Sequence, residues 1–559
     1  MSSPVSGYCV GMRNAWVSAA LFAAVASACD SSGPASTDMV PHASQQLSSS
    51  TPETPAPIVA PSFSQPDSKP PNVVLILGDD VGVDLVSAYA GFFPPTPPPN
   101  TPDTPVLDAL ARDGILFRNA WTNPGCSPSR AQILTGHHAR RTGIGGLVKS
   151  RVPSGKSLPP GLSHDIQLLP QALKSGAAPY DTAAVGKWHL ASPSQGALHA
   201  LGPDGAWFDR WAGSAYNLNG AGVGYRSWPK TFASQIRDDE CSGSYPCERT
   251  LREADACENY ATVDTTQDAL HLINTLQEPF FLYVSYNAPH TPLELPACAL
   301  PASCSAAELS YREAPPTEAE LTRAMVRTMD HEIGRLLCAI DEDDTVVIFI
   351  GDNGTAGDDA NGQPHGITSP FPGSHGKATV YNAGVNVPLI VRGPGLTHGV
   401  SEALVNSTDL FATIVDLAGR SRETVIPRDS VSITPYLHAQ PHPTPRETIL
   451  AERFTPAFTP TNFATGAPPA GYHARLDLRA VRNARFKLIQ SNRKGNIESD
   501  EFYDLASGGR LRADGKPGRD DFEQHDLMQR RSSWSPGGEI ERNYRALKQT
   551  LASELPPLP

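Results

Sequence analysis

The fold is indicated most directly by the run Asn72-Val73-Val74-Leu75-Ile76-Leu77, which is followed at once by Gly78-Asp79-Asp80. A short, almost entirely apolar run predicts a strand that is buried on both faces of a sheet. A second run, Thr345-Val346-Val347-Ile348-Phe349-Ile350, has the same design and ends at Gly351-Asp352-Asn353-Gly354. Strands of this kind are typical of parallel sheets, in which polar residues at the carboxyl ends of the strands form ligand sites.

Further strands and helices extend this pattern along the chain. Three more apolar runs predict strands, at Thr182–Val185, Phe280–Tyr286 and Val387–Val391. Helical spacing of apolar residues is found between the strands, at Thr104–Asp113, Glu318–Ile340 and Thr408–Ala418. Strands that alternate with helices predict an α/β fold, with a large mixed, mostly parallel sheet flanked by helices. We assign this main domain to residues 71–446.

The C-terminal part of the chain has a different pattern. From about Glu447, short runs with strand character are separated only by turns, at Thr448–Arg453, Leu478–Arg482, Phe486–Gln490 and Glu501–Leu505. Such closely spaced strands predict a small antiparallel sheet packed beside the main one. Residues 447–559 are therefore expected to form an antiparallel subdomain.

The N-terminal residues have the features of an export signal. Arg13 is the only charge before the apolar run Ala15–Ala28, which is too short to span a membrane and suits a signal peptide over residues 1–29. Ala26-Ser27-Ala28 before Cys29 resembles a bacterial lipobox, although ordinary cleavage after Ala28 gives the same pattern. We expect an exported protein, periplasmic or on the cell surface, with a lipid anchor at Cys29.

Residues 30–70 are rich in Ser, Thr and Pro and poor in large apolar side chains. Such a segment cannot bury enough surface to offset the entropy lost on ordering, so it is expected to be a disordered tether. Over the whole chain, 45 Lys and Arg face 58 Asp and Glu, a formal charge of −13. This balance argues against a nucleic-acid binder, but a local group of cations can still bind an anionic substrate.

The cysteines fit an exported protein. Outside the signal region and Cys126, six cysteines remain: Cys241, Cys247, Cys257, Cys298, Cys304 and Cys338. An even set favours disulfides, and the short spacings favour Cys241–Cys247 and Cys298–Cys304, with other connectivities left open. A zinc site is the weaker interpretation, because no Cys-x-x-Cys pair is present.

The polar residues after the first two strands predict a metal site. Asp79 and Asp80 are adjacent carboxylates, which would repel each other at the end of a buried strand unless a cation compensates them. Asp352 and Asn353 offer further oxygen atoms at the end of the other strand. Oxygen ligands of this kind suit Ca²⁺ or Mg²⁺. The alternative is that these residues only close the turns.

The most specific motif is Cys126-Ser127-Pro128-Ser129-Arg130, followed by Leu134-Thr135-Gly136. A lone cysteine is usually structural, but this run closely resembles the maturation motif of formylglycine-dependent sulfatases, the type I sulfatases of the alkaline phosphatase-like superfamily. Ile133 departs slightly from the motif. The resemblance covers about Pro71 to Leu527. It implies that a formylglycine-generating maturation enzyme oxidises Cys126 to formylglycine, whose hydrated aldehyde is the nucleophile.

The same resemblance assigns roles to other residues. It implies that Asp79, Asp80, Asp352 and Asn353 bind Ca²⁺, in preference to Mg²⁺, with residue 126 also facing the ion. It also implies roles for cationic and histidine side chains. Arg130 and His189 would hold the nucleophile, and Lys187 would bind sulfate. His290 and Lys377 would bind sulfate near the leaving oxygen. The segment Val380-Tyr381-Asn382-Ala383-Gly384 departs from the family pattern Gly-x-x-Tyr-Glu-Gly-Gly. His365 and His375 match no role.

Three functions follow from these residues. The first is an exported sulfatase that hydrolyses a sulfate monoester of a small molecule or carbohydrate through a Ca²⁺-supported sulfo-enzyme intermediate. The second is a formylglycine-dependent phosphonate monoester or phosphodiester hydrolase, and the third is a non-catalytic surface-binding lipoprotein on the same fold. Aromatic residues in the segment 207–252 either form the substrate rim or pack on the core: Trp207, Trp211, Tyr216, Tyr225 and Trp228.

Overall fold

The computed structural model describes residues 69–92, 101–149, 160–175, 178–237, 241, 243–296, 316–356, 375–420, 426–438, 445–493, 499–505, 523 and 525–558. The predicted signal peptide with Cys29, and the predicted tether up to residue 68, lie outside these ranges. His365 and the predicted pair Cys298–Cys304 lie outside them as well. Within these ranges, no helix combines the length and the apolar character needed to cross a membrane.

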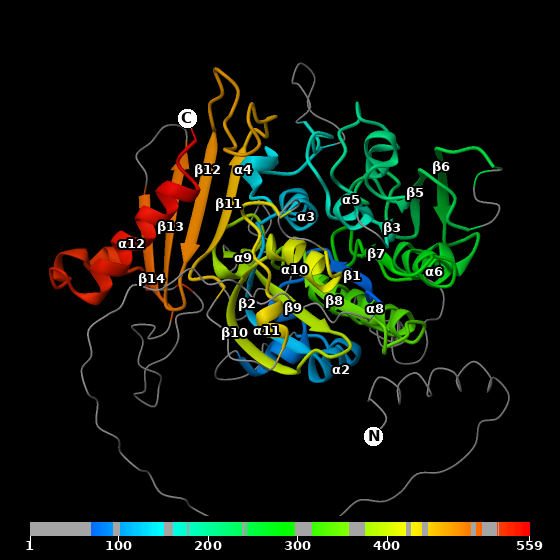
Figure 1. The fold of residues 1–559 in the computed structure, drawn as a ribbon, viewed down its shortest axis with the longest axis horizontal. Helices are drawn as coiled ribbons and strands as arrows, with labels where there is room; N and C mark the ends of the chain where they lie inside the picture. Colours follow the sequence, from blue (N-terminus) through cyan, green and yellow to red (C-terminus); the bar gives the residue numbers. More distant parts are fainter. Residues whose placement is uncertain are drawn as a thin grey trace, which may run out of the picture.

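A ten-stranded mixed sheet forms the centre of the molecule (Figure 1). Its spatial order is β10 (Gly399–Asn406), β2 (Ile115–Trp121), β9 (Asn386–Arg392), β8 (Thr345–Gly351), β1 (Asn72–Gly78), β7 (Phe280–Ser285), β3 (Asp181–Gly186), β4 (Arg210–Gly213), β5 (Ser227–Phe232) and β6 (Cys247–Arg252). The five strands from β8 to β4 are all parallel. The predicted fold class is therefore confirmed.

The remaining strands make the sheet mixed. β9 runs antiparallel to both β8 and β2, while β10 runs parallel to β2. At the other edge, β5 is antiparallel to β4 and to β6. Because β2 and β8 are both antiparallel to β9, they point in the same direction, so the carboxyl end of β2 lies at the same edge as those of the central strands.

Helices cover both faces of this sheet, as Figure 1 shows. Along β1, Val74 and Ile76 face one core and Val73 and Leu75 the other, as the period of two in a strand requires. The first core includes α2 (Pro105–Asp113), α6 (Ala261–Ile273) and α8 (Glu318–Leu337). The second includes α3 (Cys126–Thr135), α5 (Leu169–Lys174) and α10 (Asp409–Leu417). Short helices are α4 (Ala139–Thr142), α9 (Asn382–Val385) and α11 (Thr434–Leu437).

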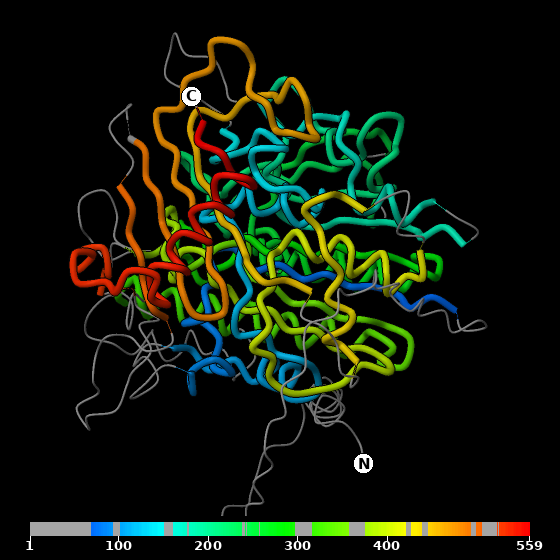
Figure 2. The backbone as a smooth tube through the Cα atoms, turned by 60° about the vertical axis from the view of Figure 1, so that its left-hand side comes forward, coloured from blue at the N-terminus to red at the C-terminus, as the bar shows by residue number. Residues whose placement is uncertain are grey.

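The predicted small antiparallel sheet is also present, separate from the main sheet. β11 (Ile449–Thr455), β12 (Leu476–Arg482), β13 (Phe486–Arg493) and β14 (Ser499–Asp504) pair in chain order, each antiparallel to the next. One face of this sheet packs against α12 (Glu539–Glu554), the other against Trp121 and residues around α9. Figure 2 shows the small sheet standing beside the main one, with α12 on its outer side.

The aromatic residues of the segment 207–252 turn out to be mostly core. Trp207, Trp211, Tyr225 and Trp228 are each at most 2% exposed. A role for these four at the substrate rim is therefore wrong, because their rings pack in the apolar cores on the two faces of the main sheet. Tyr216 is the exception, since it stays partly exposed and its ring lies edge-on to His189, with 6.4 Å between the centroids.

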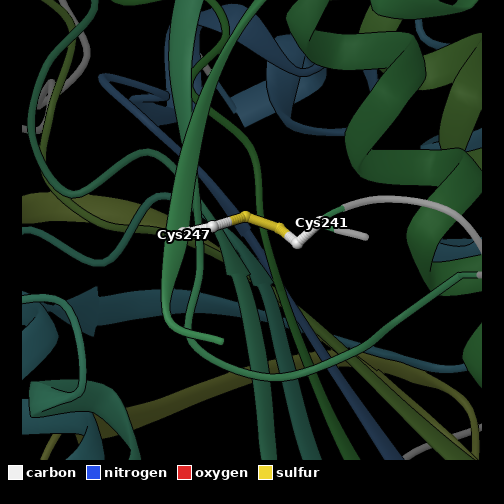
Figure 3. Close-up of a disulfide and its surroundings, with 2 residues drawn as sticks. All are labelled: Cys241 and Cys247. Atoms are coloured by element: carbon white, nitrogen blue, oxygen red, sulfur yellow. A yellow bond between two sulfur atoms is a disulfide. The ribbon is translucent and has the colours of Figure 1, made fainter. Parts of the chain in front are cut away.

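The predicted disulfide between Cys241 and Cys247 is confirmed (Figure 3). The two Cα atoms are 6.2 Å apart, and the bond ties the segment before β6 to the first residue of that strand. Cys338, at the end of α8, is disulfide-bonded as well. Cys126 is free and buried.

Candidate active site

The site lies at the carboxyl edge of the parallel strands. Backbone hydrogen bonds continue the pairing beyond the strand ends: Asp352 N to Gly78 O (3.0 Å), Asp79 N to Ala288 O (3.0 Å) and Lys187 N to Ser285 O (2.8 Å). The residues that follow β8, β1, β7 and β3 are therefore held side by side. This is the reason why motifs far apart in the sequence meet in one place.

Two other segments reach this edge because of strand direction. β2 ends at the same edge, and the turn after it leads into α3, whose first residue is Cys126. β9 runs in the opposite direction, so the segment before it, which carries Lys377 and α9, also approaches from this edge. The structure thus brings all of the predicted site residues into one cluster.

Helix α3 presents Cys126 at its N-terminus. The helix follows Gly125, and Ser129 Oγ donates to the carbonyl of Asn123 (2.7 Å), which fixes the turn before Cys126. Ser127 Oγ accepts from the backbone amide of Val148 (3.0 Å) and ties the first turn of the helix to a neighbouring loop. The positive end of the helix dipole therefore points at residue 126, where it favours developing negative charge.

Arg130 lies one turn further along α3 and is completely buried. Its Nε and Nη2 donate to Asp352 Oδ2 at 3.1 and 2.9 Å, and its Nη1 donates to the carbonyl of Lys187 at 3.0 Å. Nη1 also donates to Ser285 Oγ. One guanidinium thus joins the ends of β8, β3 and β7 to the helix that carries Cys126.

Two lysines pair with the two adjacent carboxylates. Lys187 Nζ forms an ion pair with Asp79, and Lys377 Nζ forms one with Asp80. Lys377 Nζ also lies 3.2 Å from Cys126 Sγ. Burial would raise the pKa of Asp79, but the charge of Lys187 and of its other cationic neighbours holds that pKa well below its usual range.

The buried, charged surroundings of Cys126 leave the free thiol unreactive. Burial, and then the charge of Asp79, raise the pKa of Cys126 to about 12, although Lys187 and Lys377 oppose the shift. A thiol is a nucleophile only as the thiolate, so unmodified Cys126 is a poor nucleophile at neutral pH. Burial and the nearby Asp79 also raise the pKa of Asp352 to about 7, against the effect of Arg130.

The residues present fit a divalent cation. One possible ligand atom from each of Asp79, Asp80, Cys126 and His290 lies within 4.8 Å of the others. Among the described residues, Asp79 Oδ1 and Asn353 Oδ1 are buried without a hydrogen-bond partner. Buried oxygens are normally satisfied, so two unsatisfied ones beside a carboxylate cluster are what a cation site requires.

The other two predicted ligands, Asn353 and Asp352, differ in how far their oxygens are already hydrogen-bonded. Asn353 Nδ2 donates to Asp80 Oδ1 (2.8 Å) and to the carbonyl of Gly354 (2.9 Å), which leaves the amide oxygen available. Asp352 Oδ2 already accepts two bonds from Arg130, and its Oδ1 accepts from the amide of Asp80 (3.1 Å). Asp352 therefore joins the cation site to Arg130 as well as offering it an oxygen.

Each of the two predicted histidines, His189 and His290, uses one ring nitrogen to hydrogen-bond a backbone carbonyl, which leaves the other nitrogen without a proton. His189 Nε2 lies 3.0 Å from the carbonyl of Val148 and so carries the proton, while its Nδ1 is buried with no partner among the described residues. His290 Nδ1 lies 2.7 Å from the carbonyl of Thr291, and its Nε2 lies 4.0 Å from Asp80 Oδ2. Burial, followed by the charge of Lys187, holds the pKa of His189 well below its usual range, so this ring is neutral.

Comparison with known proteins identifies the family. A family model described as Sulfatase matches residues 71–420, more than half of the chain. The chain belongs to the sulfatase family. The N-acetylgalactosamine-6-sulfatase of Homo sapiens is 32% identical to this sulfatase-family protein over 384 residues, which are 66% of each chain. The match thus spans just under two thirds of that relative's length.

Solved structures share the fold. Ps i-CgsB in complex with k-i-k-neocarrahexaose superposes with a TM-score of 0.58 at 21% identity, covering 88% of this chain and 94% of the other. BT4656 in complex with its substrate D-glucosamine-2-N,6-O-disulfate gives 0.57 at 19% identity, covering 87% and 98%. At these identities the likeness concerns the fold alone.

Asn382 stands where the family pattern has Glu, and in this sulfatase-family protein a glutamate from elsewhere in the chain lies beside it. The backbone amide of Asn382 donates to Glu523 Oε2 (2.6 Å), and its Oδ1 lies 3.4 Å from Lys487 Nζ. Lys487 and Glu523 form a buried ion pair. A carboxylate is thus present beside this turn, but it comes from the C-terminal part of the chain.

Sequence reasoning missed several residues that support the site. Ser285 could have been suspected, because it follows an apolar run directly. Tyr381 stands at the tyrosine of the family pattern, but its contact with Glu501 could not be foreseen. The carbonyl of Val148, which binds His189, and that of Pro124, which binds the amide of Ala378, left no signal in the sequence. Such contacts depend on how distant loops meet. His375, which matched no role, has its ring stacked on Tyr381 with 3.7 Å between centroids.

Proposed function

We propose that this protein is a sulfatase that hydrolyses a sulfate monoester to an alcohol and inorganic sulfate. The observation that carries the proposal is the surroundings of Cys126. This residue begins a buried helix and lies against Lys377. Arg130, Lys187, His189 and His290 are buried in the same cluster. Membership of the sulfatase family supports the same conclusion.

The charges of the pocket suit an anionic substrate. The cations Arg130, Lys187 and Lys377 are matched by the carboxylates Asp79, Asp80 and Asp352. A divalent cation would therefore leave a positive excess of two at the place where a sulfate group must bind. Positive charge fixed in a water-poor pocket stabilises the negative charge that develops on sulfate oxygens during transfer.

We propose further that a maturation enzyme converts Cys126 to formylglycine, and that Asp79, Asp80, Asp352 and Asn353 hold Ca²⁺ together with residue 126. Formylglycine, when present, supplies a hydrated aldehyde as nucleophile, and Ca²⁺ supplies Lewis-acid charge. The free Cys126 thiol, with its raised pKa, supports the need for such a modification.

The chain's own residues then divide the proton transfers. His189 has its Nε2–H bound to the carbonyl of Val148, so its bare Nδ1 can accept a proton from a hydroxyl at position 126. His290 donates from Nδ1 to a carbonyl, so in the neutral ring its Nε2 has no proton to donate to the leaving oxygen. Lys377 carries protons on Nζ and lies beside residue 126, so we assign proton donation to the leaving oxygen to Lys377.

The substrate that we propose is a sulfated carbohydrate. The human relative is named an N-acetylgalactosamine-6-sulfatase, and the two structural neighbours were solved with carbohydrate ligands. We also propose that the protein is exported and anchored by lipid at Cys29. The Cys241–Cys247 disulfide supports export, because such bonds persist in oxidising compartments.

A side-by-side assay of an aryl sulfate and an aryl phosphodiester tests the proposal, with Cys126→Ala as the matched control. We expect the wild type to favour the sulfate ester and the variant to lose the activity. Preference for the phosphodiester would establish the formylglycine-dependent phosphodiesterase instead. No hydrolysis of either ester, or of a sulfated carbohydrate, by a folded, matured protein would favour the surface-binding alternative.

A further inference from the structure

The segment 375–385, which we call the Lys377 loop, lies between the two sheets. It is held to the main domain by two backbone bonds, Lys377 N to Thr355 O (2.9 Å) and Ala378 N to Pro124 O (2.8 Å). Val380 and Val385 are buried in the core that the C-terminal sheet shares with Trp121. Figure 1 shows the C-terminal sheet on one side of α9, which ends this loop.

Polar contacts tie the same loop to the C-terminal subdomain. Tyr381 donates from its hydroxyl to Glu501 Oε2 at 2.6 Å, and its ring is stacked on His375 with 9° between the planes. The amide of Asn382 donates to Glu523 Oε2 at 2.6 Å, and Arg453 Nη1 donates to the carbonyl of Ala378. Three hydrogen bonds thus join the loop to the C-terminal subdomain, one before Val380 and two after it.

Successive side chains of β14 point to opposite faces of the C-terminal sheet, so alternate residues contact the Lys377 loop and α12. Glu501 and Tyr503 face the Lys377 loop, and Tyr503 also donates its hydroxyl to Glu501 Oε2 at 2.6 Å. Asp500 and Phe502 face the other side, where Asp500 accepts from the hydroxyl of Tyr544 on α12. One strand therefore carries a tyrosine–carboxylate contact to the Lys377 loop and a similar one to α12.

We infer that Tyr381 and Glu501 are positioning residues, through which the C-terminal subdomain holds Lys377 against residue 126. A lysine side chain has many rotamers, and its three cationic hydrogens give no preferred direction. Its placement must therefore come from the backbone that carries it. This inference rests on the proposed function, because it takes Lys377 to act on the substrate.

The first test compares Tyr381→Phe with Tyr544→Phe. Both variants lose one hydroxyl that binds a carboxylate of β14, but only the first contact holds the Lys377 loop. We expect hydrogen–deuterium exchange in the peptide covering 375–385 to rise in Tyr381→Phe and to stay unchanged in Tyr544→Phe. We also expect kcat/KM to fall by roughly tenfold or more in Tyr381→Phe alone, because a misplaced reacting group slows the reaction. Equal exchange and equal activity in the two variants would overturn the inference.

A double-mutant cycle separates positioning from a merely structural effect. In a Lys377→Ala background, Tyr381→Phe should lower kcat/KM little further, because the group that it positions is already absent. The same fold-loss in both backgrounds would overturn the inference. If Lys377→Ala itself left kcat/KM unchanged, the proposed role of Lys377 would fail instead, and the exchange comparison would still report whether Tyr381 holds the loop. Glu501→Gln, which keeps the size of the side chain, should behave like Tyr381→Phe.

Discussion

A single buried side chain, Arg130, connects the nucleophile helix to three strand ends. Lysine at this position would keep one positive charge but could not reproduce the two bonds to Asp352 together with those to Lys187 and Ser285. We expect Arg130→Lys to lower kcat/KM at least a hundredfold and to lower the free energy of unfolding by about 3 kcal/mol, as broken buried ion pairs do.

Denaturant unfolding and steady-state kinetics check this prediction. The matched control is Arg545→Lys, because Arg545 is an exposed arginine that pairs with Glu541 on α12. Its replacement should change the free energy of unfolding by less than about 0.5 kcal/mol. Similar small effects from both substitutions would contradict the role given to Arg130.

The cation site can be tested without any substrate. Because Asp79 Oδ1 and Asn353 Oδ1 are buried and unsatisfied, a cation bound there should stabilise the native state. We expect a chelator to lower the melting temperature and added Ca²⁺ to restore it. At a Ca²⁺ concentration a hundredfold above Kd, binding should raise the free energy of unfolding by about 2.7 kcal/mol. Mg²⁺ should restore less.

Asp79→Asn provides the control for this titration, since it keeps the shape of the side chain but removes its charge. Its melting temperature should respond much less to Ca²⁺ than that of the wild type. A wild type that is indifferent to both chelator and Ca²⁺ would show that these oxygens are not a metal site.

For single residues, the sequence predicted the members of the site better than it predicted their surroundings. Asp79, Asp352 and Cys126 could be found because each ends a buried strand or lies in a specific motif. The buried state of Trp207 and Trp211 could not be predicted, because an aromatic side chain suits a rim as well as a core. Only packing against particular neighbours distinguishes the two.

Among the elements, helix α3 depends on the glycine that ends it. Gly136 has φ = +66°, and a Cβ there would lie 2.8 Å from Pro427 Cγ and 2.9 Å from Phe411 Cβ. We expect Gly136→Ala to lower the free energy of unfolding by about 2–4 kcal/mol, from backbone strain and overpacking together. The activity should fall as well, because this helix carries Cys126 and Arg130.

Gly419 is a matched control for this substitution. It follows α10 and has the same φ of +66°, but a Cβ there would meet nothing within 4 Å. Gly419→Ala should therefore show only the backbone strain, about 1–2 kcal/mol. Thermal or urea unfolding of both variants measures the difference, and equal costs would mean that packing around Gly136 is looser than described.

The elements themselves were predictable where they are apolar throughout. β1, β8 and β7 fall within one or two residues of the predicted runs. β2 was missed because Arg118 and Asn119 interrupt its apolar run, and α12 was missed because only Tyr544, Leu547 and Leu551 are buried on it. The antiparallel direction of β9 is set by long-range pairing, which a local pattern does not contain.

At the scale of the whole molecule, the two sheets share one core. Ile489 of β13 is 3% exposed and packs in the same cluster as Trp121 of β2 and Val385 of α9. We expect Ile489→Ala to cost about 2–5 kcal/mol, from lost burial and the cavity left behind. Activity and circular dichroism should then be lost in one coincident transition.

Val400→Ala serves as the control, because Val400 is 58% exposed on β10, and its truncation should cost less than about 0.5 kcal/mol. If Ile489→Ala unfolded in two separate steps, with activity surviving the first, the two sheets would be independent. Such a result would also count against a positioning role for the C-terminal subdomain.

In the mechanism that we propose, residue 126 acts as the nucleophile only after it has been modified. The most direct measurement is the mass of the proteolytic peptide that contains Cys126, taken from active protein purified from the organism that produces it. We expect the mass of an aldehyde or its hydrate in place of the thiol. A plain thiol throughout a preparation that releases sulfate would contradict it.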